Sequence, residues 1–153
     1  ELHGAESRNI IPGWAYLTGT IPTWTDKTRT AMPERLEHLI QRSAKAFNAK
    51  AKLTYQEGNA GLSNDSECAE RCRKSVVKLF GEEAVSDYEG TLAGEDFSEY
   101  LDIVPGVFVF LGCRNPDVDA VYPQHSGYYT VDESVLKNGA ALAAQYAIDF
   151  LAE

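Results

Sequence analysis

Alternating and helical patterns of apolar residues divide the first part of the chain into two strands and a helix. Residues 14–24 (WAYLTGTIPTW) alternate roughly and are rich in aromatic and β-branched residues, which predicts a strand that Pro22 interrupts near its end. Apolar residues then recur at helical spacing and predict a helix over about 30–49, with Pro33 tolerated in its first turn. Residues 51–57 (AKLTYQE) alternate again and predict a second strand.

A Gly and Asn cluster, GNAGLSND, predicts a domain boundary after residue 57. Beyond it we expect a helix over about 66–80, with Gly81 as a left-handed cap, and a short helix over 94–101. Residues 107–111 (VFVFL) form an almost wholly apolar run, which is typical of a strand covered on both faces in an α/β layer fold.

The last predicted helix starts at a capping box formed by Thr130 and Glu133 and continues to about Leu151. Its small residues should let it pack closely on a sheet. The pattern as a whole predicts an α/β protein. At 153 residues and 44% apolar content the chain is long enough for one domain or two small pieces, with a buried core.

Composition and charge exclude several classes of function. The formal net charge is -9 and the pI is near 4.8, so nucleic acid or an anionic membrane would meet a repulsive field. The apolar stretches are too short to span a bilayer, and the N-terminal ELHGAESRN carries no charged-then-apolar leader. Three cysteines, of which Cys68 and Cys72 lie four apart on a predicted helix, suit free thiols in a reducing compartment. We therefore expect a soluble, cytoplasmic protein with neither a nucleic-acid nor a membrane partner.

His125 is the candidate for chemistry that the pattern singles out. It lies in YPQHSGYYTVDE, between an apolar strand and a capped helix, where α/β proteins place many of their sites. A neutral imidazole there can bind a metal through one nitrogen while a neighbouring group holds the other. The residues alone favour an ordinary hydrogen-bonded loop histidine over a metal ligand.

The other polar candidates have structural interpretations. Glu95 and Asp96 are adjacent, so they cannot face one another as an acid/base pair, and Asp96 is expected to cap the short helix. Asp132 and Glu133 suit the first turn of a helix because they offset its dipole. Asn9, in NIIPGW, either closes a turn through its amide or presents that amide to a ligand.

No complete reaction centre can be read from the residues. His3 and His38 form no cluster with His125, and there is no HxD, HExxH or Cys/His spacing, no glycine-rich phosphate loop and no GxSxG elbow. The chain therefore contains one candidate metal ligand and lacks the several others that metal catalysis needs.

Four segments together resemble the second half of the metal-dependent amidohydrolases that include hippurate hydrolase, aminoacylase and indoleacetyl-amino-acid hydrolase. They are NIIPGWAYLTGT (9–20), GEDFSEY (94–100), VPGVFVFLG (104–112) and HSGYYTVDESVLKNGAALAAQYAIDFL (125–151). Each segment alone is a weak signal. Their order and spacing cover nearly the whole chain, and that combination is specific.

The resemblance implies a particular fold and site. In that family a two-layer α+β lid domain, which commonly forms the dimer contact, is inserted into an α/β catalytic domain. Residues 1–57 resemble the last part of the lid, and residues 58–153 resemble the closing part of the catalytic domain. His125 is then a ligand of a two-metal site for zinc, manganese, cobalt or nickel, and Asn9 contributes to the substrate pocket.

The family reaction is hydrolysis of the amide bond of an N-acyl amino acid by a metal-activated water. The general-base glutamate and the remaining ligands belong to the first half of the family fold, so we expect this chain to be a fragment that is inactive alone and retains no metal. The alternatives are a non-catalytic module that self-associates and one that binds an acyl amino acid without hydrolysing it.

Two positions depart from the family pattern. Pro22 follows GTI where the family usually has an arginine after GT, a candidate for gripping the substrate carboxylate. Gly127 replaces the proline that usually follows HS. Both departures bear on substrate preference and leave the metal position unchanged.

Overall fold

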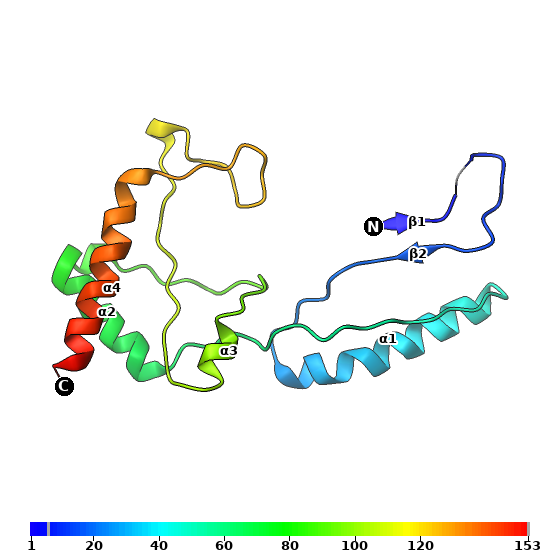
Figure 1. Ribbon diagram of the computed structural model, residues 1–153, viewed down its shortest axis with the longest axis horizontal. Coiled ribbons are helices and arrows are strands. Elements are labelled where there is room, and N and C mark those ends of the chain that lie inside the picture. The colour runs from blue at the N-terminus through cyan, green and yellow to red at the C-terminus, as the bar shows by residue number, and fades with distance from the viewer. Residues whose placement is uncertain (6, 153) are drawn as a thin grey trace. The chain divides into compact units, whose positions relative to one another are not determined.

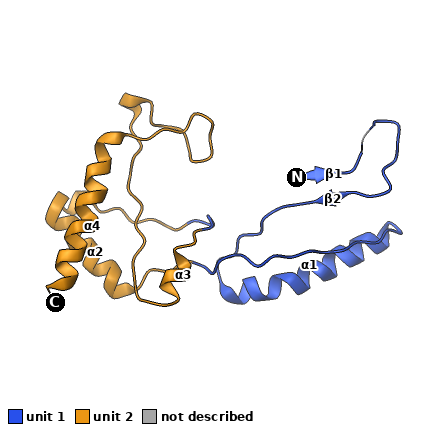
Figure 2. Ribbon diagram, in the orientation of Figure 1, with its two compact units in different colours: residues 1–61, 91–94 blue, residues 62–90, 95–153 orange. Residues whose placement is uncertain are grey.

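A computed structural model describes residues 1–5 and 7–152, and the mixed α/β chain forms two compact units (Figure 2). Unit 1 comprises residues 1–61 with 91–94, and unit 2 comprises residues 62–90 with 95–153. The sequence predicted a boundary after residue 57, and the units divide a few residues later, within the same Gly and Asn cluster.

Unit 1 contains a short two-stranded antiparallel sheet, the only sheet among residues 1–5 and 7–152 (Figure 1). Strand β1 (Leu2–His3) pairs with β2 (Tyr16–Leu17), with Leu2 opposite Leu17 and His3 opposite Tyr16. The prediction of a strand over 14–24 is therefore wrong for most of that range. A ladder can extend only where a partner strand lies opposite, and β1 supplies only two residues.

Helix α1 (Asp26–Ala46) begins and ends earlier than the sequence predicted. The Thr25 hydroxyl oxygen accepts the backbone N–H of Thr28 at 3.2 Å and so caps the first turn. The helix ends before Asn48, whose φ of 55° leaves the helical region. Because the helix starts at Asp26, Pro33 lies inside it, and its predicted place in the first turn is wrong.

Residues 51–57 run back along α1 and form no strand, contrary to prediction (Figure 1). Near one end of the segment, Gln41 Nε2 donates to the carbonyl oxygen of Ala51 at 3.0 Å. At the other end, Arg29 Nη1 lies 2.6 Å from Glu57 Oε1. Side chains of the helix thus satisfy groups along this segment, since no partner strand is present among the described residues.

Helix α2 (Ser66–Phe80) in unit 2 has the predicted bounds. Asp65 caps it, accepting the backbone N–H groups of Glu67 at 3.1 Å and Cys68 at 2.9 Å. The helix ends at Gly81, whose φ of 89° is positive as predicted. Its ψ of 167° lies outside the left-handed helical region, so the predicted left-handed cap is corrected to a more extended one. A 3₁₀ turn, η1 (Glu82–Ala84), follows.

Helix α4 (Leu136–Leu151) follows a 3₁₀ turn, η3 (Glu133–Val135). Asp132 Oδ1 accepts the backbone N–H of Ser134 at 2.9 Å and caps this turn. The predicted capping box at Thr130 is wrong because an aspartate two residues later provides a competing side-chain acceptor. The acidic character of this first turn, which the sequence did predict, is confirmed.

Helices α2 and α4 pack side by side (Figure 1) through a polar junction. Ser75 is fully buried, and its Oγ donates to Asp149 Oδ2 at 2.7 Å. Lys78 Nζ and Gln145 Nε2 also reach Asp149 Oδ1, at 2.9 and 2.7 Å. These donors, with Ser75 first, hold the pKa of Asp149 below its usual range. The prediction that α4 packs on a sheet is therefore wrong: its described partner is another helix.

Helix α3 (Ser98–Leu101) is a single turn and occupies only the end of the predicted range of 94–101. Glu95 Oε1, rather than the predicted Asp96 side chain, accepts the backbone N–H of Phe97 at 3.2 Å.

Residues 107–111 are not part of a sheet, and the predicted buried strand is wrong. The Asn64 amide takes the place of a neighbouring strand at one residue, accepting the N–H of Phe108 at 2.7 Å and donating to its carbonyl oxygen at 2.9 Å. Aromatic rings connect this segment to its surroundings through successive contacts of Tyr88, Phe110, Phe108, Phe97 and Tyr100.

The buried core is smaller than the sequence predicted. Among the described residues the buried apolar side chains are Cys68, Cys72 and Ala120, and many large apolar side chains are exposed. All three cysteines are free thiols, as predicted, and burial raises the pKa of Cys72. Extended segments that find no partner strand leave both of their faces open, which explains the difference from the expected core. No helix in the described part of the chain is long and apolar enough to cross a membrane.

Gly139 on α4 offers a stabilising substitution. An alanine Cβ there would lie 3.1 Å from Leu111 Cδ2, but the Leu111 side chain is exposed and flexible enough to move. We expect Gly139→Ala to raise the free energy of unfolding by about 0.5–1 kcal/mol, through helix propensity. Urea titration followed by circular dichroism measures this. Gly139→Val should lose the gain because a branched side chain meets Leu111 again; equal stabilisation by both would contradict the expectation.

Candidate functional site

The loop that carries His125 begins at a closed turn. Asn115 and Ala120 form an antiparallel bridge with N–H to O distances of 2.9 and 3.0 Å. Between them lies a 3₁₀ turn, η2 (Pro116–Val118), and Asn115 Oδ1 caps it by accepting the N–H of Asp117 at 3.0 Å. Asp119 has a φ of 57°, which closes the turn. Ala120 is buried, so the start of the loop is anchored in unit 2.

The C-terminal end of the loop, at Asp132, is hydrogen-bonded to residues at and just before the same turn. The backbone N–H of Asp132 donates to the carbonyl oxygen of Cys113 at 3.1 Å. Asn115 Nδ2 donates to Asp132 Oδ2 at 2.8 Å. The Asn115 hydrogen bond, followed by those from Ser134, holds the pKa of Asp132 below its usual range. Asp132 thus both closes the loop and caps the turn before α4.

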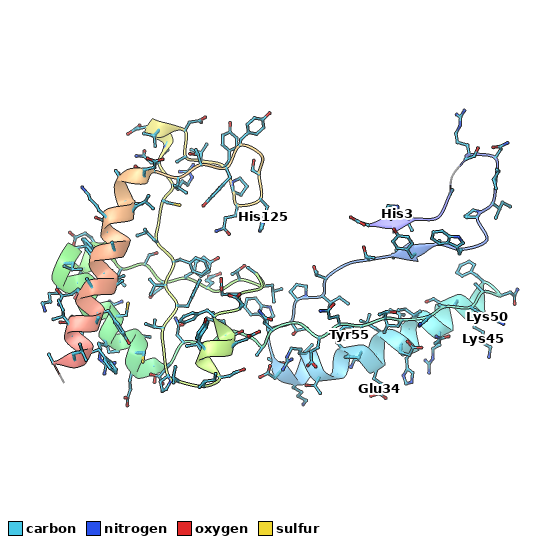
Figure 3. The ribbon with its side chains drawn as sticks, viewed as in Figure 1. His3, Glu34, Lys45, Lys50, Tyr55 and His125 are labelled. Atoms are coloured by element: carbon cyan, nitrogen blue, oxygen red, sulfur yellow. The ribbon has the colours of Figure 1, made fainter. Side chains whose placement is uncertain are left out.

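His125 lies on this closed loop, which precedes α4 (Figure 3). The N–H of Ser126 donates to the carbonyl oxygen of Pro123 at 3.2 Å, so His125 lies inside a tight turn. Its φ of 67° is in the left-handed region, where a residue other than glycine costs about 1–3 kcal/mol. Its side chain is exposed. The imidazole is therefore accessible, on a backbone held in an unusual conformation.

The described residues do not build a metal site by themselves. No group of three or more His, Cys, Asp or Glu side chains in the described ranges lies close enough to hold a metal ion. His125 can supply one nitrogen ligand, whereas a structural or catalytic site for a divalent transition metal needs at least three protein ligands. His125 is therefore a candidate ligand that needs partners from outside its own loop.

Asn9 makes a local side-chain contact. Its Oδ1 accepts the Ser7 hydroxyl at 2.5 Å, and the N–H of Ile10 lies 3.4 Å from the Ser7 carbonyl oxygen. The side chain is exposed, so this contact does not exclude a ligand. Asn9 belongs to unit 1 and His125 to unit 2.

The other two histidines have structural surroundings. His3 stacks on Tyr16 with ring centroids 4.8 Å apart, and His38 lies on α1. Both belong to unit 1 (His3 is labelled in Figure 3). Neither joins a group of potential metal ligands among the described residues.

Asn115 is the residue that sequence reasoning missed. Its amide bonds to Asp117 on one side and to Asp132 on the other, and so it connects both ends of the loop. A local signal for the first contact was available, because asparagine before proline, followed by aspartate, is typical of a side-chain-capped turn. The contact with Asp132 spans 17 positions, and no local pattern indicates it.

Acid should weaken the closure of this loop. A carboxyl group whose pKa is lower in the folded than in the unfolded chain stabilises the fold above its unfolded pKa, and this contribution is lost as the pH falls through the folded pKa. We expect protection factors of the loop amides to fall as the pH drops below about 4, the usual value of an unfolded aspartate. Asp132→Asn keeps a capping oxygen but cannot titrate, so its loop should lose this pH dependence. Equal acid sensitivity in hydrogen exchange of both proteins would contradict this.

The family model of Peptidase family M20/M25/M40 matches residues 5–149. Thermostable carboxypeptidase 2 of Saccharolobus solfataricus is 31% identical over 150 residues, which are 97% of this chain and 37% of the relative. IAA-amino acid hydrolase ILR1-like 2 of Arabidopsis thaliana is 29% identical over 157 residues, covering 100% of this chain and 35% of the relative. N-acetyl-L-cysteine deacetylase of Bacillus subtilis is 28% identical over 136 residues, covering 89% and 31%. The chain thus spans about a third of the length of these relatives.

A solved structure has the same fold. The Bacillus subtilis YXEP protein, described as a dinuclear metal binding peptidase from the M20 family, superposes with a TM-score of 0.80 at 24% identity. The match covers 99% of this chain and 40% of that protein. The family match includes the His125 loop, the Asn9 turn, helices α1 and α2, and α4 up to residue 149. The chain belongs to peptidase family M20/M25/M40.

Proposed function

We propose that this chain is the C-terminal portion of a metal-dependent amidohydrolase that cleaves the amide bond of N-acyl amino acids. The observation that carries the proposal is the family match over residues 5–149, which includes the exposed His125 loop. Among the relatives are proteins named for cleavage of N-acetyl-L-cysteine and of indoleacetyl-amino acids. Carboxypeptidases are among them too, so small peptide-like substrates belong to the same proposal.

In this proposal His125 is one ligand of a site for two divalent metal ions. Its accessible imidazole and its fixed, positive-φ backbone support the assignment. Such metals supply a water activated at neutral pH and polarise a carbonyl oxygen. The further ligands and the general base lie outside the described residues of this chain. The metal is zinc, manganese, cobalt or nickel, all of which imidazole suits.

The same proposal assigns domains and a second contact to substrate. Residues 1–57 are the last part of a lid that forms a homodimer, and residues 58–153 close the catalytic domain. The division of the chain into two compact units supports this assignment. Asn9 presents its exposed amide to the substrate. A cytoplasmic location accords with three free thiols.

A chimera tests the proposed reaction. The matched 136-residue segment of the Bacillus subtilis N-acetyl-L-cysteine deacetylase would be replaced by the corresponding part of this chain. With added zinc or manganese, the folded chimera should release amino acid from hippurate or an N-acetyl amino acid, whereas the 153-residue chain alone should not. Turnover by the chain alone would refute the fragment assignment. A folded, metal-loaded chimera inactive on all N-acyl amino acids would refute the reaction.

Self-association without catalysis is the second candidate. Large apolar side chains are exposed on the strands and loops of unit 1, among them Ile11 at 94% and Leu17 at 78%. Exposed apolar surface of this kind often marks a protein interface. Light scattering after size exclusion should show a concentration-dependent dimer under this alternative. A strict monomer throughout the micromolar range would argue against it.

A further inference from the structure

Two tyrosines flank His125 at equal distance along the chain. Tyr122 precedes it by three residues and Tyr128 follows it by three. Their ring centroids are 5.6 Å apart, with an interplanar angle of 40°. This ring pair joins the two arms of the loop across the histidine.

Both tyrosine rings are exposed to solvent, so neither belongs to a buried core. Tyr122 is 41% exposed and Tyr128 is 78% exposed. Neither is part of the α2–α4 junction, so the packing that holds those helices together does not depend on the ring pair. The contact between the two rings therefore stabilises the loop itself, because aromatic pairs in this tilted arrangement attract one another.

Hydrogen bonds order parts of both arms, and on the preceding side the N–H of Val121 donates to the Asp119 carbonyl oxygen at 2.9 Å. Ser126 Oγ accepts the N–H of Tyr128 at 3.2 Å, and the Ser126 carbonyl oxygen accepts the N–H of Tyr129 at 3.1 Å. These two bonds order the arm that follows His125. On the preceding side, Ser126 donates its N–H to Pro123 at 3.2 Å, and the ring of Tyr122 then connects that arm to Tyr128.

We propose that Tyr122 and Tyr128 are positioning residues, whose ring contact holds the backbone of His125 in its positive-φ conformation and so fixes the direction of the imidazole. The conformational claim stands on this chain alone, and only its use in metal binding rests on the proposed function. A ring contact across the loop offsets the unfavourable backbone of His125, which an untied loop would leave by rotating φ. Neither tyrosine needs to touch metal or substrate for this effect.

The test uses the full 153-residue chain in solution and NMR of its backbone amides. In Tyr122→Ala and Tyr128→Ala, the heteronuclear NOE of His125 should fall toward the value of an unstructured peptide, and its Cα shift should move toward the random-coil value. Tyr122→Phe and Tyr128→Phe keep the ring and should restore both. Amides of α2 and α4 should be unchanged in all four variants, which separates a local effect from unfolding.

Two results would overturn the proposal. Alanine variants with an unchanged NOE and Cα shift at His125 would show that hydrogen bonds alone hold the loop. Phenylalanine variants that resemble the alanine variants would assign the effect to the hydroxyl groups instead of the rings.

Metal retention in the chimera distinguishes this proposal from the proposed function. There the alanine variants should weaken metal affinity by about 10-fold and the phenylalanine variants should not, as expected for residues that orient a ligand. If His125→Ala leaves metal retention intact, the assigned metal role is wrong, and the NMR result still decides the ring contact. If His125→Ala removes metal while the tyrosine variants change neither affinity nor NMR, the ring contact alone is wrong.

Discussion

Ser75→Leu is expected to lower the free energy of unfolding by about 2–4 kcal/mol, the largest effect on stability that the structure predicts. Ser75 is fully buried between α2 and α4, where its hydroxyl bonds to both Asp149 and the Arg71 carbonyl oxygen. A leucine would add volume to a closed interface and remove the donor that Asp149 faces. Because the chain buries few other side chains, this loss is a large part of its free energy of unfolding.

A serine on the same helix provides the matched control. Ser66 begins α2 and is exposed, so Ser66→Leu introduces the same side chain without entering the interface. Its effect should stay within about 0.5 kcal/mol. Ser75→Ala should cost about 1 kcal/mol, since it removes the hydrogen bonds and adds no volume. Urea titrations followed by circular dichroism rank the three variants, and equal stability of Ser75→Leu and Ser66→Leu would refute the buried junction.

His125→Ala is expected to reduce kcat/KM of the active chimera by at least about 100-fold. Replacing groups that merely orient a metal ligand typically costs 10–100-fold, and removal of the ligand itself should cost no less. The substitution should leave the fold intact, because the side chain is exposed and alanine removes only the imidazole. Circular dichroism of the variant checks that the loss is local.

His38→Ala is the matched control for this loss. His38 lies on α1 in unit 1 and its side chain is exposed, so the same substitution is made far along the sequence from the His125 loop. The proposal assigns it no role, and its kcat/KM should match that of the unmodified chimera. Equal losses in the two variants would show that the effect of His125→Ala is not specific.

Elements stabilised by local contacts were predictable from the sequence. The end of α2 was predicted from Gly81, and the Asp65 cap that fixes its start also lies within the helix's own neighbourhood. The extents of the strands were not predictable, because pairing needs a partner elsewhere in the chain. Residues 107–111 have the composition of a buried strand, but no strand lies beside them in the described structure. Composition therefore predicted what that segment is suited to, and contacts decided the conformation it has here.

The candidate site divides in the same way. His125 could be singled out from its place between an apolar run and a helix, and the structure places it on an exposed loop. Its positive φ, the Tyr122–Tyr128 ring contact and the bond from Asn115 to Asp132 could not be predicted. Each depends on the path of a loop whose residues have no periodic pattern, so it is set by the folded structure.

Metal content of the folded chimera tests the central claim most directly. After dialysis against metal-free buffer, elemental analysis should find two divalent ions per subunit in the unmodified chimera and in His38→Ala. We expect His125→Ala to retain at least one ion fewer, since a ligand of the site is missing. A His125→Ala chimera that is folded and retains as much metal as the unmodified chimera would contradict the assignment of His125 as a metal ligand.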